Sequence, residues 1–245
     1  MERFFGIFGI IFIFLIAFLM SNNRKAINYK TIITGFVLQI LLAVFIFKVP
    51  LGQMIFLKTG LFITKILEFA KTGGEFVFGP LMGNGGVMEN VFGTGSHVFA
   101  LQLICSLIFM MILVNILYYY GIMQRVVPVI GKAMNKLMSV SGAEALSNVA
   151  SAFVGQIAAQ IMIRPYLAKL TRSELLASMT GSMACISAAT MPIYIGLGVP
   201  AEYLLAASVM AAPGALVLSK IVYPETGNPE TSENITIHFS KRKRP

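Results

Sequence analysis

An apolar stretch from residue 143 to residue 163 carries polar side chains that can bind a small molecule or a cation. These side chains belong to Ser147, Asn148, Ser151, Gln156 and Gln160. Hydroxyl and amide groups exchange hydrogen bonds, and their oxygens suit hard cations. Gly155, next to Gln156, allows a helix to break, and two helix ends that meet expose unpaired backbone groups. The stretch therefore predicts a polar binding site, with one kinked helix bonded to its neighbours as the alternative.

Residues for enzymatic chemistry are few. The chain has two histidines, His97 and His238, and its acidic residues are all glutamates, so neither histidine has an evident partner for base catalysis. Cys105 and Cys185 lie far apart in apolar stretches and lack the spacing of a metal site. We therefore expect a protein that is not an enzyme, with no catalytic residue and no bound cofactor.

The composition predicts that the polar stretch lies in a membrane. Hydrophobic residues make up 57% of the 245 residues and charged residues 12%, about half of the usual charged share. A soluble fold of this size needs more charge to cover its surface. The net charge of +9 could suggest nucleic-acid binding, but the cations are dispersed between apolar runs instead of gathered on one face. We therefore expect the lipid bilayer as a partner, and no nucleic acid.

Apolar runs along the chain predict an all-α polytopic membrane protein. Crossing the hydrocarbon core takes roughly 20 residues, and five runs are close to that length: residues 4–20, 32–47, 100–120, 175–198 and 203–222. Residues 51–71 mix polar and apolar residues at helical intervals, which predicts an amphipathic helix in the membrane interface. Residues 72–96 are rich in glycine and predict a loop with a short helix at most.

Charge placement favours a re-entrant hairpin over one crossing for residues 143–163. If this segment returns to its own side, most of the 19 basic residues lie in the cytoplasm, as the distribution of Lys and Arg in membrane proteins requires. Five basic residues remain outside: Arg3, Lys48, Lys58, Lys65 and Lys71. We therefore expect five crossings of the plasma (inner) membrane, with the N-terminus outside and the C-terminus in the cytoplasm.

This arrangement divides the chain into three parts. Residues 1–123 form scaffold helices with the interfacial helix (about 51–71) and an external glycine-rich loop. Residues 124–223 form the re-entrant hairpin and two further transmembrane helices. Residues 224–245 form a polar, basic cytoplasmic tail, which ends in Lys-Arg-Lys-Arg-Pro.

In a set of short motifs, the chain resembles the concentrative nucleoside transporter family. The motifs are SNNRKAIN (21–28), LYYYGIMQ (117–124), FVGQ (153–156), IRPYL (163–167), LTRSEL (170–175), YLLAASVMAAP (203–213) and YPET (223–226). The similarity extends from about residue 5 to residue 226. It implies a homotrimer that takes up nucleosides in symport with sodium or protons.

The resemblance also implies that the hairpin tip binds the nucleobase. The usual tip of the family reads Gly-Gln-Thr-Glu-Ala-Pro, whereas residues 155–160 read Gly-Gln-Ile-Ala-Ala-Gln. Gln156 keeps an amide that can bind a base edge, but Ile157 and Ala158 depart from the pattern and cannot. Because a lost polar partner costs about 1–3 kcal/mol in a desolvated site, we expect these two positions to weaken nucleoside binding.

A cation site is implied beside the tip, at Ser151, Val154, Cys185 and Ile186. Val154 and Ile186 would contribute backbone carbonyls, which any substitution preserves. Ser151 keeps an oxygen ligand, but Cys185 offers soft sulfur in place of oxygen, which suits sodium poorly. The coupling ion, sodium or proton, therefore stays open.

Members of the family continue for about as many residues again, through a second hairpin and the residues that bind ribose. The main hypothesis is therefore nucleoside transport by the N-terminal half of a concentrative-type permease, for which a separate C-terminal half is a possible partner. The alternative is a non-transporting, truncated or decayed membrane protein, or a subunit that needs a separate C-terminal half.

Overall fold

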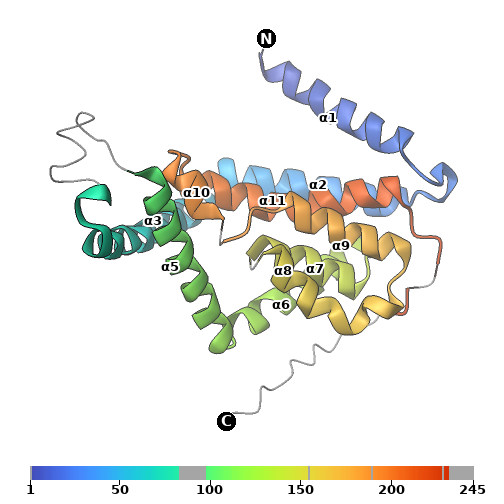
Figure 1. Ribbon diagram of the computed structural model, residues 1–245. Coiled ribbons are helices and arrows are strands. Elements are labelled where there is room, and N and C mark those ends of the chain that lie inside the picture. The colour runs from blue at the N-terminus through green and yellow to red at the C-terminus, as the bar shows by residue number, and fades with distance from the viewer. Residues whose placement is uncertain (1, 83–97, 154, 189, 228, 232–245) are drawn as a thin grey trace.

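The structure is a computed structural model that describes residues 2–82, 98–153, 155–188, 190–227 and 229–231 (Figure 1). Within these ranges every regular element is helical, which confirms the predicted all-α class. The elements are α1 (Glu2–Leu19), η1 (Arg24–Ala26), α2 (Tyr29–Phe47), α3 (Pro50–Phe78), η2 (Gly79–Met82), α5 (Phe99–Tyr119), α6 (Ile122–Met138), α7 (Gly142–Phe153), α8 (Gln156–Ile163), η3 (Arg164–Lys169), α9 (Arg172–Ala184), α10 (Met191–Gly196) and α11 (Ala201–Val222).

Local capping sets where several helices begin. The side chain of Asn28 accepts hydrogen bonds from the backbone N–H groups of Lys30 and Thr31 at the start of α2. Pro50 is at the start of α3, where its missing N–H costs nothing because the first turn has no internal acceptor. Thr171 and Glu174 form a reciprocal capping box at the start of α9.

Three of the described helices are long and apolar enough to cross a membrane: α2, α5 and α11. The predicted run at residues 4–20 forms α1, whose apolar part Phe8–Leu19 is shorter than these three helices. The side chains of α2 and α5 are largely exposed along the chain's surface, as expected for helices that face lipid. The chain is a multi-pass membrane protein.

The predicted loop at residues 72–96 is wrong in its first part. Helix α3 continues through Phe78, beyond the predicted end of the amphipathic helix near residue 71, and η2 follows. Gly74 explains the error, because a Cβ at this position would lie 2.9 Å from the sulfur of Cys105 on α5. The glycine permits a close approach of α3 and α5 rather than a turn. Residues 83–97, which include His97, lie outside the described part of the chain.

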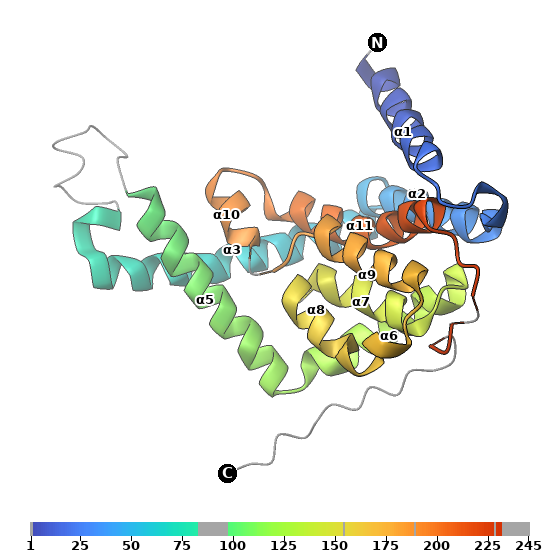
Figure 2. The ribbon, with the colours of Figure 1, turned by 45° about the vertical axis from the view of Figure 1, so that its right-hand side comes forward.

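Residues 143–163 form two helices that meet at Gly155, as predicted. Helix α7 ends at Phe153, α8 begins at Gln156, and the two helices pack against each other (Figure 2). Gly155 has a φ of +103°, a backbone conformation that side chains with a Cβ disfavour. Helix α7 is buried from Ala143 to Ala152 and packs against α6, α8, α9 and α11. Helix α7 therefore lies at the centre of the packed helices, whereas α8 lies nearer the surface.

The predicted span over residues 175–198 is not one continuous helix. Helix α9 ends at Ala184, and α10 begins only at Met191, followed by Pro192. Cys185 has extended backbone angles, with φ −88° and ψ +139°. This second interruption means that one long predicted crossing is replaced by two shorter helices.

Helix α11 packs both against α2, near the N-terminus, and against the hairpin. It lies beside α2 in both views (Figures 1 and 2) and also packs against α7 and α9. After α11 the chain returns to the start of the hairpin, where the backbone N–H of Gly142 donates to the carbonyl of Thr231 over 3.0 Å. The rest of the predicted tail, residues 232–245, lies outside the described residues.

Candidate functional site

The two helix interruptions touch each other. Gly155 is at the tip of the hairpin, and Ser187 is in the break between α9 and α10. A Cβ at position 155 would lie 3.0 Å from the Cβ of Ser187, closer than ordinary packing. The contact brings together the backbone groups at the ends of two broken helices, which carry partial charges.

Serine pairs join α7 to α9 behind this contact. The hydroxyls of Ser147 and Ser178 lie 2.6 Å apart, and those of Ser151 and Ser182 lie 3.1 Å apart. The Ser151 hydroxyl also donates to the carbonyl of Ser147 over 2.8 Å. These four serines are buried. Since a buried hydroxyl without a partner is costly, the pairs fix how the two helices face each other.

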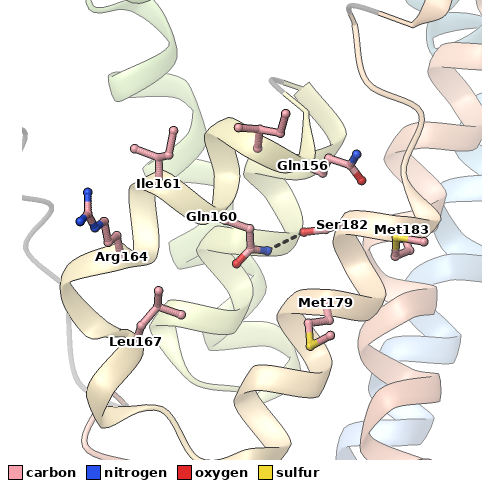
Figure 3. Close-up of a pocket in the computed structure, with 9 residues that line it drawn as sticks. Gln156, Gln160, Ile161, Arg164, Leu167, Met179, Ser182 and Met183 are labelled. Carbon is pink, nitrogen blue, oxygen red and sulfur yellow. Dashed lines mark hydrogen bonds between the residues drawn. The ribbon is translucent and has the colours of Figure 1, made fainter.

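A pocket of about 550 Å³ opens on the other side of the serine pairs, between α8 and α9. Figure 3 shows the amide of Gln160 directed from α8 to Ser182 on α9, with 2.7 Å between Nε2 and Oγ. The pocket is lined by Gln156, Ile157, Gln160, Ile161, Arg164, Leu167, Met179, Ser182 and Met183. Its wall is thus mainly apolar, with the hydrogen-bonded Gln160 and Ser182, the Gln156 amide and the Arg164 side chain as its polar groups.

Two of the three predicted substrate residues, Gln156 and Ile157, line this pocket. Both side chains are exposed, and Ile157 has 73% of its surface accessible. Ala158 belongs to α8, but its side chain is outside what the structure describes. The arrangement can hold a flat, partly apolar ligand and offers it one exposed amide.

Three of the four predicted cation residues lie among the described residues. Ser151 is buried on α7, and its partner Ser182 is in the last turn of α9, just before Cys185 and Ile186. The carbonyl of Ile186 accepts a hydrogen bond from Ser208 Oγ over 2.7 Å, and the Cys185 thiol is 4.0 Å from the carbonyl of Ser208. Val154 lies outside the described residues.

Neither Ser182 nor Ser208 is among the site residues predicted from the sequence. Ser182 belongs to the pocket wall and to the pair with Ser151, and Ser208 lies on α11 beside the break after α9. A signal for Ser182 was available, because Ser178 and Ser182 are one helical turn apart in an apolar run and would face the same neighbour.

A buried ion pair was missed as well. Lys220 Nζ on α11 lies 2.8 Å from Glu144 Oε2 on α7, and both side chains are almost fully inaccessible. Glu225 Oε2 lies 3.6 Å from the same Nζ, and the Ser173 hydroxyl accepts from it over 3.0 Å. The signal was Glu144 inside the apolar stretch 143–163, since an ionisable residue within a membrane segment needs a partner.

Two family models match the chain. The one described as Na+ dependent nucleoside transporter N-terminus matches residues 8–81, and the one described as Nucleoside recognition matches residues 100–201. The second match contains the hairpin, the serine pairs and the pocket wall.

Curated relatives and solved structures agree with these matches. The chain is 35% identical over 233 residues to Nucleoside permease NupC of Helicobacter pylori, covering 95% of the chain and 55% of the relative. It is 36% identical over 224 residues to Sodium/nucleoside cotransporter 1 of Mus musculus, covering 91% and 33%. The structure of CNTnw in an inward-facing substrate-bound state superposes with a TM-score of 0.87 at 37% identity, covering 94% of the chain and 55% of CNTnw.

The chain thus spans about half the length of the bacterial relatives that it matches. Sequence motifs, two family models and the fold all agree. The chain belongs to the concentrative nucleoside transporter family and corresponds to the N-terminal half of its members.

Proposed function

We propose that the chain acts in cation-coupled nucleoside uptake, as the N-terminal half of a concentrative-type permease. The observation that carries the proposal is the contact between the two broken helices at Gly155 and Ser187, next to a pocket with Gln156 on its wall. Secondary transporters build their substrate sites from such interrupted helices near the middle of the bilayer. The names of the relatives give nucleosides as the substrate class.

The pocket wall suits a nucleobase. Gln156 offers a donor and an acceptor, which match the mixed edge of a base. Ile157, Ile161 and Met183 give apolar surface for the faces of the ring. This half of the permease would therefore bind the base, and nucleoside affinity would depend strongly on Gln156.

The coupling cation, sodium or proton, would act at Ser151, Val154, Cys185 and Ile186. Ser151 and Ser182 bring hydroxyl oxygens together, and Ile186 brings a carbonyl oxygen. Oxygen ligands suit sodium, whereas the thiol of Cys185 does not. Replacing Cys185 with serine should therefore strengthen sodium dependence.

The same proposal extends to a partner surface for a C-terminal half. Ile157, Ile161 and Met183 have 73%, 64% and 82% of their surface accessible next to the pocket. Apolar side chains gathered around a polar site favour a covered interface. This observation favours a second candidate function, a subunit that is active only with a separate C-terminal half. A homotrimer is proposed for the assembled carrier.

For the orientation, we infer an external N-terminus and a cytoplasmic C-terminus in the plasma (inner) membrane. The basic residues on both sides of the hairpin support this topology, because it keeps them in one compartment. Single cysteines in place of Lys136 and Lys169 test it with an impermeant thiol reagent. Labelling in the same compartment is expected, and labelling in opposite compartments would refute the re-entrant hairpin.

Uridine uptake tests the function. The chain is expressed in bacterial cells that lack nucleoside uptake, alone and together with the C-terminal half of the Helicobacter pylori permease. We expect the two halves together to give more uptake than the C-terminal half alone. Gln156→Leu should abolish this increase. Uptake by the chain alone would eliminate the need for a partner half. Background uptake in every arm, with both polypeptides in the membrane, would refute the proposed function.

A further inference from the structure

Gln160 lies where the pocket meets the serine pairs. It belongs to α8, lines the pocket, and is half-buried. Its Nε2 lies 2.7 Å from Ser182 Oγ and 2.9 Å from Ser178 Oγ, and the Ser178 hydroxyl is 3.2 Å from Gln160 Oε1. Figure 3 shows this amide turned toward α9. Gln160 therefore binds to both serine pairs that connect α7 with α9.

The hydrogens of this network can be assigned so that each hydroxyl donates once. Ser147 donates to Ser178, which donates to Gln160 Oε1. Gln160 Nε2 donates to Ser182, which donates to Ser151, and Ser151 donates to the carbonyl of Ser147. An amide can donate and accept at once, so glutamine fits this position where a residue with one function would not.

Helix α8 depends on tertiary contacts such as these hydrogen bonds to stay in place. It has eight residues, follows directly after the left-handed Gly155, and ends in η3. A short helix is marginal by itself and is held by tertiary contacts. Gln156 and Gln160 are one turn apart and line the same pocket. The hydrogen bonds that hold Gln160 on α9 therefore also set the position of Gln156 relative to α9.

We propose that Gln160 is a positioning residue: its bonds to Ser178 and Ser182 hold α8 on α9 and thereby set the place of the Gln156 amide in the pocket. The usual tip of the family has proline at this position, whereas this chain has Gln160. The inference rests on the proposed function, because it assigns to Gln156 the contact with the base.

Kinetics with two size-matched variants test the consequence for binding. Gln160→Met keeps length and volume but loses the hydrogen bonds, whereas Gln160→Glu keeps an acceptor for Ser178 but loses the N–H donor to Ser182. We expect Gln160→Met to raise the KM for uridine about tenfold with an unchanged maximal rate per molecule. Gln160→Glu should give a KM between those of Gln160→Met and the parent chain, and the control Gln102→Met on α5 should stay within about threefold of the parent chain. An unchanged KM in Gln160→Met, or an equal rise in the control, would overturn the proposal.

Hydrogen–deuterium exchange tests the positioning without transport. In the purified full chain, Gln160→Met and the double variant Ser178→Ala/Ser182→Ala should both speed amide exchange in residues 156–163 and leave α11 unchanged. Combining all three changes should add little, since each removes the same bonds. Unchanged exchange in α8 would overturn the positioning role. If uptake is absent but exchange responds as expected, the proposed function fails and the positioning role stands.

Discussion

Lys220 Nζ and Glu144 Oε2 lie 2.8 Å apart and tie the end of α11 to the start of the hairpin. Glu144 also accepts a hydrogen bond from the backbone N–H of Ser141 over 2.6 Å, and the Lys220 ammonium donates to Ser173 at the start of α9. Helices α7, α9 and α11 are thus fastened at one end by Lys220 and the groups that contact it. The opposite ends of α7 and α9 are where the helix breaks meet.

Removing the cation of this pair should destabilise the protein strongly. Lys220→Met leaves the Glu144 carboxylate buried without its partner, which typically costs about 3–5 kcal/mol. The expected result is a large drop in the thermal unfolding temperature of the purified protein in detergent.

A double variant and a surface pair control this measurement. Lys220→Met/Glu144→Leu should recover part of the lost stability, because the Glu144 carboxylate is no longer buried without a cation, while Glu225 still lacks Lys220. Lys169→Met breaks a pair with Glu230 whose side chains are 63% and 65% accessible, so its effect should be small. Equal destabilisation by Lys169→Met would contradict the role of burial.

Gly181→Ala should disrupt the packing of α7 on α9. A Cβ at position 181 would overlap the side-chain amide of Asn148, which donates to the carbonyls of Glu144 and Ala177. Overpacking of this kind costs about 1–3 kcal/mol. Chemical unfolding followed by circular dichroism should detect the loss.

The matched control is Gly73→Ala in α3, where a Cβ would have no atom within 4 Å among the residues that the structure describes. Alanine is the better helix former by about 0.5–1 kcal/mol, so this variant should be neutral or slightly more stable. If Gly181→Ala behaves in the same way, α7 and α9 are not in the close contact described above.

Gly155→Ala tests the hairpin tip. The substitution strains a backbone with φ +103° and pushes a Cβ against Ser187, so uridine uptake with the second half should fall by at least tenfold. Gly198→Ala, at φ +92° and with open space among the described neighbours, carries only the strain. Strain alone costs of order 1–3 kcal/mol. Equal uptake by the two variants would mean that the contact with Ser187 does not matter.

Threonine and glutamate at positions 157 and 158 should increase nucleoside affinity. Ile157 lines the pocket, and the double variant Ile157→Thr/Ala158→Glu adds polar partners for a base, each worth about 1 kcal/mol or more. Calorimetry with uridine, in the presence of the C-terminal half, should give at least a tenfold lower Kd. Unchanged binding would show that the resemblance at the tip does not extend to the base contact.

The sequence predicted the break at Gly155 because glycine and amide residues interrupt an otherwise apolar run. It also predicted α2, α5 and α11 from apolar length alone. The break after Ala184 was missed, although Pro192 follows it, because apolar residues continue on both sides. Hydropathy measures average composition, and the scattered Ser and Thr residues of this segment do not show where the helix breaks.

Contacts between residues that lie far apart in the sequence were also not predicted. Gln160 appeared in the sequence as one of several polar residues, and nothing in the spacing along the chain paired it with Ser178 and Ser182. Glu144 and Lys220 are separated by most of the second half of the chain. Such pairs depend on how helices pack, which a single sequence does not contain.

The left-handed turn at Gly155 keeps the backbone of the tip independent of the side chains that follow it. The conformation requires glycine at that one position, while Ile157 lines the pocket with 73% of its surface accessible. Substitutions at 157 and 158 can therefore alter which molecules are recognised while the architecture stays intact. Ligand preference can thus diverge between related transporters through a few substitutions at the tip, while the helical fold is retained.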